Sequence, residues 1–126
     1  MDKKNYRILV LDDDPDIGMM IKMMLEYKGH SVVLVERAEK ASSVIHDDHF
    51  DLLIMDMLLS GDNGTDVCKN LKQSSPIPIL MISAHPNAKE ICLAAGADEF
   101  IAKPFDMQDM LSRINQLMQS TIGDRQ

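Results

Sequence analysis

The sequence predicts an α/β fold in which helices flank a parallel sheet. Five short apolar runs alternate with segments of helical periodicity, and no linker or low-complexity segment separates them. The runs are apolar along their whole length, which is typical of strands buried on both faces of a parallel sheet. A chain of 126 residues is long enough for one such domain with a substantial core.

The apolar runs give the expected strands. They cover residues 8–11, 31–35, 52–55, 79–82 and 100–102. The run 31–35 is less uniformly apolar when its flanks are included, so we place it at an edge of the sheet. Pro76 and Pro78 come just before the fourth run, where proline is tolerated because the first residues of a strand need not donate a hydrogen bond.

The helices are expected at 15–28, 38–46, 65–73, 87–95 and from residue 107 onward. Asp14 followed by Pro15 is typical of a helix N-cap and first turn, and Gly29 ends that helix. Asp106 is expected to cap the last helix. The segment 58–64 is expected to be a loop. Two helices have clear apolar faces, namely Ile17, Met20, Ile21, Met24 and Leu25 in the first and Met107, Met110, Leu111, Ile114, Leu117 and Met118 in the last.

Composition excludes several classes of protein. The formal net charge of −7 argues against binding to nucleic acid or to an anionic membrane. No stretch resembles a signal peptide or reaches the length of a transmembrane helix. Cys68 and Cys92 lack metal-ligand spacing, which favours two reduced buried thiols and a cytoplasmic location. We expect one domain over 1–119 and a polar tail over 120–126.

Reactive side chains follow four of the five strands. Asp12 and Asp13 come after the first strand and Asp56 after the third. The fourth is followed by Ser83 and the fifth by Lys103. In a parallel sheet, functional residues collect at the carboxyl ends of the strands. Three acids, a hydroxyl and an ammonium group can hold a divalent cation, supply a carboxylate nucleophile and neutralise a phosphoryl group.

The two adjacent aspartates indicate a cation site. Two carboxylates after a buried strand repel each other unless a cation offsets their charge. Oxygen ligands suit Mg²⁺, with Mn²⁺ as an alternative. The simpler interpretation is that the acidic run only caps the first helix. Asp14 alone satisfies that need, so we favour a metal site that Asp56 shares.

The chain resembles the receiver (CheY-like) domain of two-component response regulators over nearly its whole length. The motifs ILVLDDDPDI, DLLIMDM, ILMISAH, AGADEF and KPF match those of the family in order and at similar spacing. The resemblance implies a flavodoxin-like (βα)5 fold with strand order 2-1-3-4-5, and a site at the switch point between strands one and three.

The resemblance also implies a role for each site residue. Asp56 is then the phosphoacceptor. Asp13 binds Mg²⁺ directly and Asp12 helps through water, with Asp56 and the backbone carbonyl of Leu58 as further ligands. Ser83, Ala84 and Lys103 bind the phosphoryl group. Ser83 and Phe100 form the switch, with Phe100 turning inward on phosphorylation, and the Lys103–Pro104 peptide bond is cis.

The implied function is phosphorelay signalling. A sensor histidine kinase or a histidine phosphotransfer protein donates the phosphoryl group, and hydrolysis of the acyl phosphate resets the protein, which is not a turnover enzyme on an external substrate. The apolar Leu58 is expected to slow that hydrolysis. Glu99, Asp109 and Arg113 resemble residues that pair across a dimer face in regulators of the winged-helix class, which would imply a homodimer on phosphorylation. Three solvated charges are an equal alternative.

Three alternatives remain open from the residues. An aspartate-nucleophile phosphatase of the haloacid dehalogenase type wants a second acid two residues after the nucleophile, where this chain has Leu58. A flavodoxin-like cofactor binder wants a phosphate loop rich in serine, threonine and glycine after the first strand, where this chain has DDDPD. A receiver that acts only as a phosphorylation-independent interaction module is disfavoured by the complete set of acids, hydroxyl and lysine.

Overall fold

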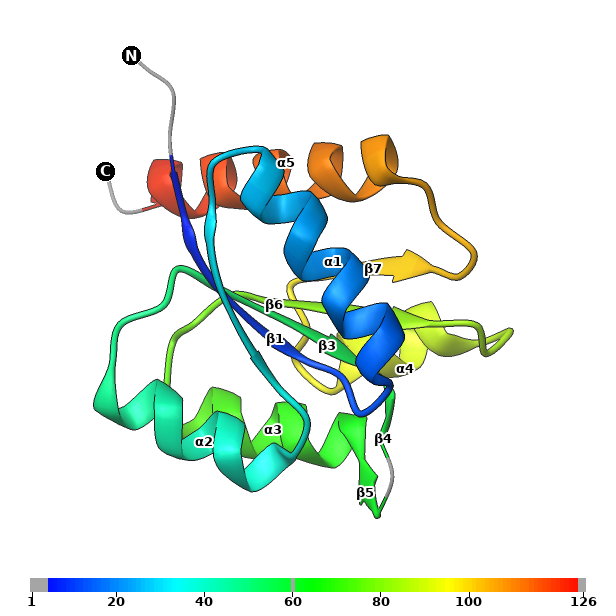
Figure 1. Cartoon of the computed structure of the whole chain (residues 1–126). Helices are drawn as coiled ribbons and strands as arrows, with labels where there is room; N and C mark the ends of the chain where they lie inside the picture. The colour runs from blue at the N-terminus through cyan, green and yellow to red at the C-terminus, as the bar shows by residue number, and fades with distance from the viewer. Residues whose placement is uncertain (1–4, 60, 125–126) are drawn as a thin grey trace.

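The computed structural model describes residues 5–59 and 61–124 and contains one five-stranded parallel sheet (Figure 1). Its strands are β1 (Arg7–Leu11), β2 (Ser31–Val35), β3 (Leu52–Asp56), β6 (Ile79–Ser83) and β7 (Glu99–Ala102), in the spatial order β2-β1-β3-β6-β7. The labels β4 (Leu58–Leu59) and β5 (Asp62–Asn63) belong to a separate two-stranded hairpin, so β6 and β7 are the fourth and fifth strands of this sheet. The order is therefore the expected 2-1-3-4-5. The flavodoxin-like fold and the edge position of β2 are therefore confirmed.

In the part of the chain that the structure describes, five helices cover the two faces of the sheet. They are α1 (Pro15–Tyr27), α2 (Ala38–Asp47), α3 (Gly64–Ser74), α4 (Ala88–Ala94) and α5 (Met107–Asp124). Figure 1 shows α1 and α5 on one face and α2, α3 and α4 on the other. Within the described residues, no helix is long and apolar enough to span a bilayer.

Local chemistry sets the ends of the helices. The side chain of Asp14 accepts hydrogen bonds from the backbone N–H groups of Asp16 and Ile17, which otherwise have no partner in the first turn of α1. Gly29 follows α1 with φ of 97°, a conformation that glycine adopts without strain. Asp106 Oδ1 accepts from the N–H of Asp109 at 2.7 Å, so the expected cap of α5 is confirmed.

The core has two layers, one on each side of the sheet. Alternate residues of each strand point to opposite faces, so neighbours in the sequence enter different layers. Ile8 and Val10 pack with buried residues of α1 and α5, whereas Leu9 and Leu11 pack with those of α2, α3 and α4. Cys68 and Cys92 belong to the second layer, and both are fully buried. Burial raises the pKa of both thiols, that of Cys92 to about 11.

Two methionines expected in the core are half exposed. Met20 and Met107 expose 50% and 46% of their surface. The buried side chains of α1 are those of Ile21, Met24 and Leu25, next to the buried Gly18. Met20 is not among them and lines a cavity with Pro104 and Phe105. A helix on a sheet buries only a narrow stripe, so a residue at its margin stays accessible.

Two boundaries also differ from expectation. The segment expected as a loop contains strands β4 (Leu58–Leu59) and β5 (Asp62–Asn63), which pair antiparallel. Residue 60 lies between them and outside the described residues. Helix α5 continues to Asp124, past the boundary expected at residue 119. Residues 125–126 of the expected tail and residues 1–4 also lie outside the described residues.

Candidate functional site

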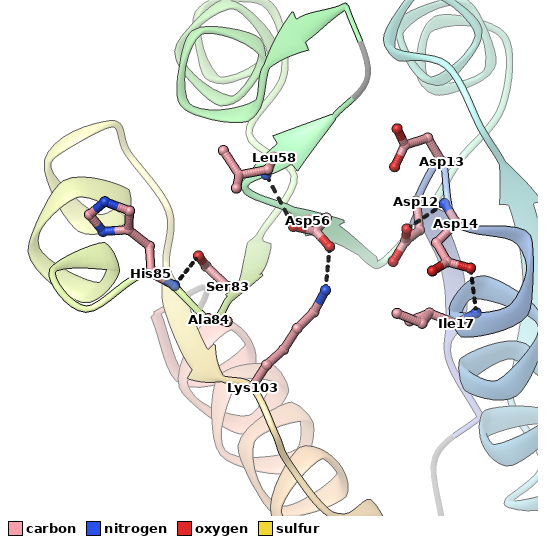
Figure 2. Close-up of a pocket in the computed structure, with 10 residues that line it drawn as sticks. All are labelled: Asp12, Asp13, Asp14, Ile17, Asp56, Leu58, Ser83, Ala84, His85 and Lys103. Atoms are coloured by element: carbon pink, nitrogen blue, oxygen red, sulfur yellow. Dashed lines mark hydrogen bonds and ion pairs between the residues drawn. The ribbon is translucent and has the colours of Figure 1, made fainter.

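A cavity of about 360 Å³ opens at the carboxyl ends of the central strands. It collects residues that are far apart in the sequence, and Figure 2 shows the acidic groups of the segment between β1 and α1 on one side with Ser83 and His85 on the other. Asp56 and Lys103 lie between these two sides. The lining residues are Asp12, Asp13, Asp14, Ile17, Asp56, Leu58, Ser83, Ala84, His85 and Lys103.

Asp56 is held by contacts to both of its carboxylate oxygens. Oδ2 lies 2.6 Å from Nζ of Lys103, and Oδ1 accepts a hydrogen bond of 3.0 Å from the N–H of Leu58. Only 8% of the residue is exposed. A carboxylate this buried needs a compensating charge, and the ammonium group of Lys103 provides it.

Asp12 carries a charge that its surroundings do not favour. The residue is 2% exposed, and this burial is the main reason that its pKa is raised above the ordinary aspartate value. The hydrogen bond of 2.8 Å from the N–H of Asp14 to Oδ1 opposes the shift, while the charges of Asp56 and Asp13 add to it. A cation placed between these carboxylates would relieve the repulsion.

The donor set of this cavity fits Mg²⁺. Asp12, Asp13 and Asp56 bring oxygen ligands to one cavity, and Leu58 lines it as well. Within residues 5–59 and 61–124, no three histidine, cysteine, aspartate or glutamate side chains form a ready-made metal cluster. Mg²⁺ does not require one, because it is bound through one or two carboxylates and keeps several waters.

Ser83 places a buried hydroxyl beside Asp56. It is 2% exposed, and its Oγ accepts a hydrogen bond of 3.0 Å from the N–H of His85. A hydroxyl can donate one hydrogen bond while it accepts another, so Ser83 is able to donate to an oxyanion in the cavity. Ala84 lines the same cavity.

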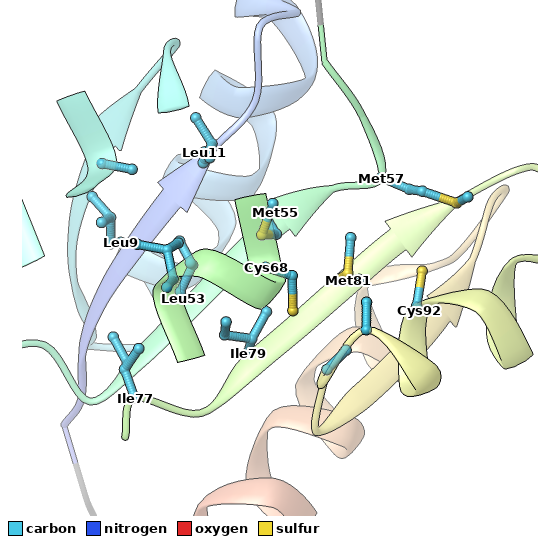
Figure 3. Close-up of a cluster of buried hydrophobic side chains, with 14 of the residues drawn as sticks. Leu9, Leu11, Leu53, Met55, Met57, Cys68, Ile77, Ile79, Met81 and Cys92 are labelled. Atoms are coloured by element: carbon cyan, nitrogen blue, oxygen red, sulfur yellow. The ribbon is translucent and has the colours of Figure 1, made fainter. Parts of the chain in front are cut away.

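Phe100 lies outside the cavity. It is 7% exposed and belongs to the same core layer as Met81 and Cys92, the layer drawn in Figure 3. The ring is already buried in this conformation, and its inward turn on phosphorylation stays a prediction. Its purely apolar ring explains this position, since Phe100 has no hydroxyl that would require a partner or water.

Glu99, Asp109 and Arg113 are brought together, but within one chain. The guanidinium of Arg113 lies 3.3 Å from Glu99 Oε1 through Nη1 and 3.4 Å from Asp109 Oδ1 through Nε. These contacts differ from the alternative of three separately solvated charges. The Lys103–Pro104 peptide bond is cis, as the resemblance implies.

Three cavity residues were not predicted as part of the site. They are Asp14, Ile17 and His85. Asp14 and Ile17 belong to the N-cap and first turn of α1, which the acidic run places next to the metal ligands. The N–H of Asn87 donates a hydrogen bond of 3.2 Å to Nδ1 of His85. These residues follow closely after the ends of strands, and that position in the sequence would have indicated that they line the site.

Comparison with known proteins gives consistent matches. The family model described as "Response regulator receiver domain" matches residues 8–115. DNA-binding response regulator MtrA of Mycolicibacterium smegmatis is 33% identical over 116 residues, which cover 90% of this chain and 51% of MtrA. The chain thus spans about half the length of the curated relatives that it matches.

Solved structures agree with this match. A CheY-like response regulator receiver domain protein from Methanospirillum hungatei superposes with a TM-score of 0.89 at 27% identity, covering 96% of this chain and 99% of that one. NtrX from Brucella abortus gives a TM-score of 0.91 at 28% identity, covering 97% of this chain and 28% of NtrX.

Proposed function

The chain belongs to the response regulator receiver domain family, and on that premise we propose that Asp56 accepts a phosphoryl group from a phosphohistidine. The donor is a sensor histidine kinase or a histidine phosphotransfer protein. The protein assists its own phosphorylation and dephosphorylation and does not turn over an external substrate. The net charge of −7 suits a protein partner better than nucleic acid.

One observation carries this proposal most directly. Lys103 Nζ lies 2.6 Å from Asp56 Oδ2, which supports the proposal because it holds a cation beside the carboxylate that would receive the phosphoryl group. Phosphoryl transfer needs positioning and charge neutralisation more than acid–base chemistry. An ammonium group on a long side chain can follow the phosphoryl oxygens after transfer without leaving the cavity.

The proposed step is an in-line displacement at phosphorus. An oxygen of the Asp56 carboxylate forms the new P–O bond while the P–N bond to the donor imidazole breaks and its electron pair returns to the ring. Lys103 pairs with the phosphoryl oxygens, and Ser83 donates its hydroxyl hydrogen to one of them. Bound Mg²⁺, or Mn²⁺ in its place, supplies further charge neutralisation. Asp13, Asp56 and the carbonyl of Leu58 would bind the ion directly, and Asp12 would act through a water molecule.

Phosphorylation then biases the surface formed by α4, β7 and α5. Ser83 Oγ accepts from the N–H of His85, which lies just before α4, so a shift of Ser83 toward a phosphoryl oxygen pulls on the start of that helix. Phe100 contributes as a packed core residue on β7. Hydrolysis of the acyl phosphate restores the ion pair between Lys103 and Asp56.

Intact-mass measurement with a small phosphodonor tests this function. We expect the protein to gain the mass of one phosphoryl group when incubated with Mg²⁺ and acetyl phosphate, and Asp56→Asn to gain none. Removal of Mg²⁺ with a chelator is expected to prevent the gain in the unmodified protein. A protein that gains no mass under these conditions would be an interaction module, and the proposal would fail.

A further inference from the structure

Strand β7 forms one edge of the sheet, so its outer side faces no other strand of the described residues. The N–H of Lys103, just after β7, donates to the carbonyl of Ser83 at 2.9 Å and thus points toward β6. Backbone groups of successive residues in a strand point alternately to the two sides. Phe100, an odd number of residues before Lys103, therefore directs its N–H and C=O outward. Its bonding partners agree with this assignment.

Both outward groups of Phe100 are occupied by side chains of the same chain. Its N–H donates to Glu99 Oε1 at 2.9 Å, and its carbonyl accepts from Arg113 Nη1 at 2.7 Å. The same Nη1 lies 3.3 Å from Glu99 Oε1. We call this set of contacts the edge clamp. It closes a ring between β7 and α5, and its two charged side chains are 28% and 37% exposed.

We propose that the edge clamp of Glu99 and Arg113 closes the outer edge of β7 against a strand from a second copy of this chain. An edge strand with free N–H and C=O groups is a template for strand addition by another chain. Here the outward N–H and C=O groups of Phe100, in the four-residue strand β7, already have partners, and bulky charged side chains cover them. A second copy cannot form its backbone hydrogen bonds at Phe100 until the edge clamp opens.

The second copy is the partner that the charges indicate. Glu99, Asp109 and Arg113 carry both signs on one surface, and a surface with both signs can pair with its own copy across a two-fold axis. In this structure the opposite charges already satisfy each other inside one chain. The edge clamp therefore favours the monomer. This inference stands apart from the proposed phosphorylation, because the contacts exist without a phosphoryl group.

Hydrogen exchange tests the contacts of the edge clamp. Removal of the acceptor in Glu99→Ala is expected to speed exchange of the Phe100 amide by about tenfold or more, since only a side chain protects it. The Lys103 amide, bonded to the Ser83 carbonyl, is the internal reference and should not change. Equal exchange of the Phe100 amide in the variant and the unmodified protein would overturn the assignment.

Sedimentation velocity of the unphosphorylated protein tests the consequence. Arg113→Ala and Glu99→Ala each open the edge clamp, and both are expected to self-associate at concentrations at which the unmodified protein is a monomer. Asp109→Ala is the matched control, because it removes only the helical contact to Arg113 Nε. Far-ultraviolet circular dichroism establishes that each variant is folded.

Two results would overturn the proposal. One is that folded Glu99→Ala and Arg113→Ala remain monomeric over the same concentration range as the unmodified protein. The other is that Asp109→Ala associates as strongly as they do, since the effect would then follow from lost surface charge and not from the edge of β7.

Discussion

Nζ of Lys103 lies 2.6 Å from Oδ2 of Asp56, although 47 positions separate the two residues in the sequence. Their strands are not neighbours, because β6 lies between β3 and β7. The lysine side chain therefore reaches across the end of β6, where Ser83 is located. A shorter side chain at position 103 could not make this contact, so the length of lysine is as important as its charge.

Lys103→Met separates the charge of this residue from its length. Without the ammonium group, Asp56 remains available to a cation, but the charge that gathers on the phosphoryl oxygens is less well neutralised. We expect phosphorylation by acetyl phosphate to slow by at least about tenfold, equivalent to about 1.4 kcal/mol of barrier. Affinity for Mg²⁺, measured by calorimetry, is expected to stay equal or to rise.

The control for this variant is Lys89→Met, which removes an exposed ammonium group from α4. It should react at the rate of the unmodified protein. An unchanged rate in Lys103→Met would contradict a role for Lys103 in the transfer.

Asp12→Asn is predicted to stabilise the protein while weakening its metal site. Burial raises the pKa of Asp12, so the folded protein keeps a proton that the unfolded chain has already lost. The stability that this group contributes is present at acidic pH, falls as pH rises between the ordinary and the raised pKa, and remains lost at neutral pH. In the absence of Mg²⁺ we expect Asn at this position to raise the free energy of unfolding at pH 7, because the cost of burying the carboxylate charge is removed.

Urea denaturation at several pH values checks whether Asp12→Asn raises or lowers the free energy of unfolding. The advantage of Asp12→Asn should shrink as pH falls, and added Mg²⁺ should stabilise the unmodified protein more than the variant. Asp47→Asn, at an exposed position at the end of α2, should show neither effect. A variant that is less stable than the unmodified protein at pH 7 would rule out this account of Asp12.

Gly64→Ala is predicted to be strongly destabilising. A Cβ at position 64 would overlap the backbone carbonyl of Met57, to which the N–H of Gly64 already donates at 2.8 Å. The nearest atoms belong to the backbone of Asp56 and Met57 and have little room to relax, so we expect a loss of about 3 kcal/mol in the free energy of unfolding, at the upper end of overpacking costs.

Gly61→Ala is the comparison for that loss. Gly61 has φ of +79°, but no atom lies within 4 Å of an added Cβ. The substitution there places a residue with a Cβ in a left-handed backbone conformation, which costs about 1 kcal/mol in the free energy of unfolding. Thermal or urea denaturation measures the loss of stability in both variants. Equal losses would show that the close approach to Met57 is unimportant.

Leu58→Asn is predicted to shorten the life of the acyl phosphate. Leu58 is 65% exposed and lines the cavity next to Asp56, so its apolar side chain would shield the phosphorus of a phosphorylated Asp56 from water. An amide at this position can hold the attacking water, and we expect hydrolysis to be several times faster, by analogy with other water-positioning groups. Loss of the phosphorylated mass over time measures the rate, with the exposed Leu93→Asn on α4 as the control. An unchanged lifetime would refute the shielding role.

The strand ends could be predicted because their signals are local. The apolar runs that end at Asp12, Asp56 and Ser83 became adjacent or nearly adjacent strands, and parallel topology placed their ends together. The N-caps at Asp14 and Asp106 also depend only on neighbouring residues. The roles of these residues in phosphate chemistry follow from the family resemblance, and they remain predictions for the experiments above.

Features that depend on how elements dock could not be predicted. The exposure of Met20 and Met107 depends on the rotation of α1 and α5 over the sheet, which helical periodicity does not specify. The hairpin of β4 and β5 escaped detection because glycine and polar residues at its tip are equally typical of an open loop. The contact of Arg113 with the carbonyl of Phe100 depends on the tilt of α5 against an edge strand.

The burial of Cys68 and Cys92 has a practical consequence for spectroscopy. Only thiolates react with maleimides, and these two thiols are inaccessible and have raised pKa values. A single cysteine introduced on the surface can therefore carry a fluorophore or spin label without prior removal of the native pair. Cys92 lies on α4, so its labelling rate would also report any opening of that helix as the protein changes state.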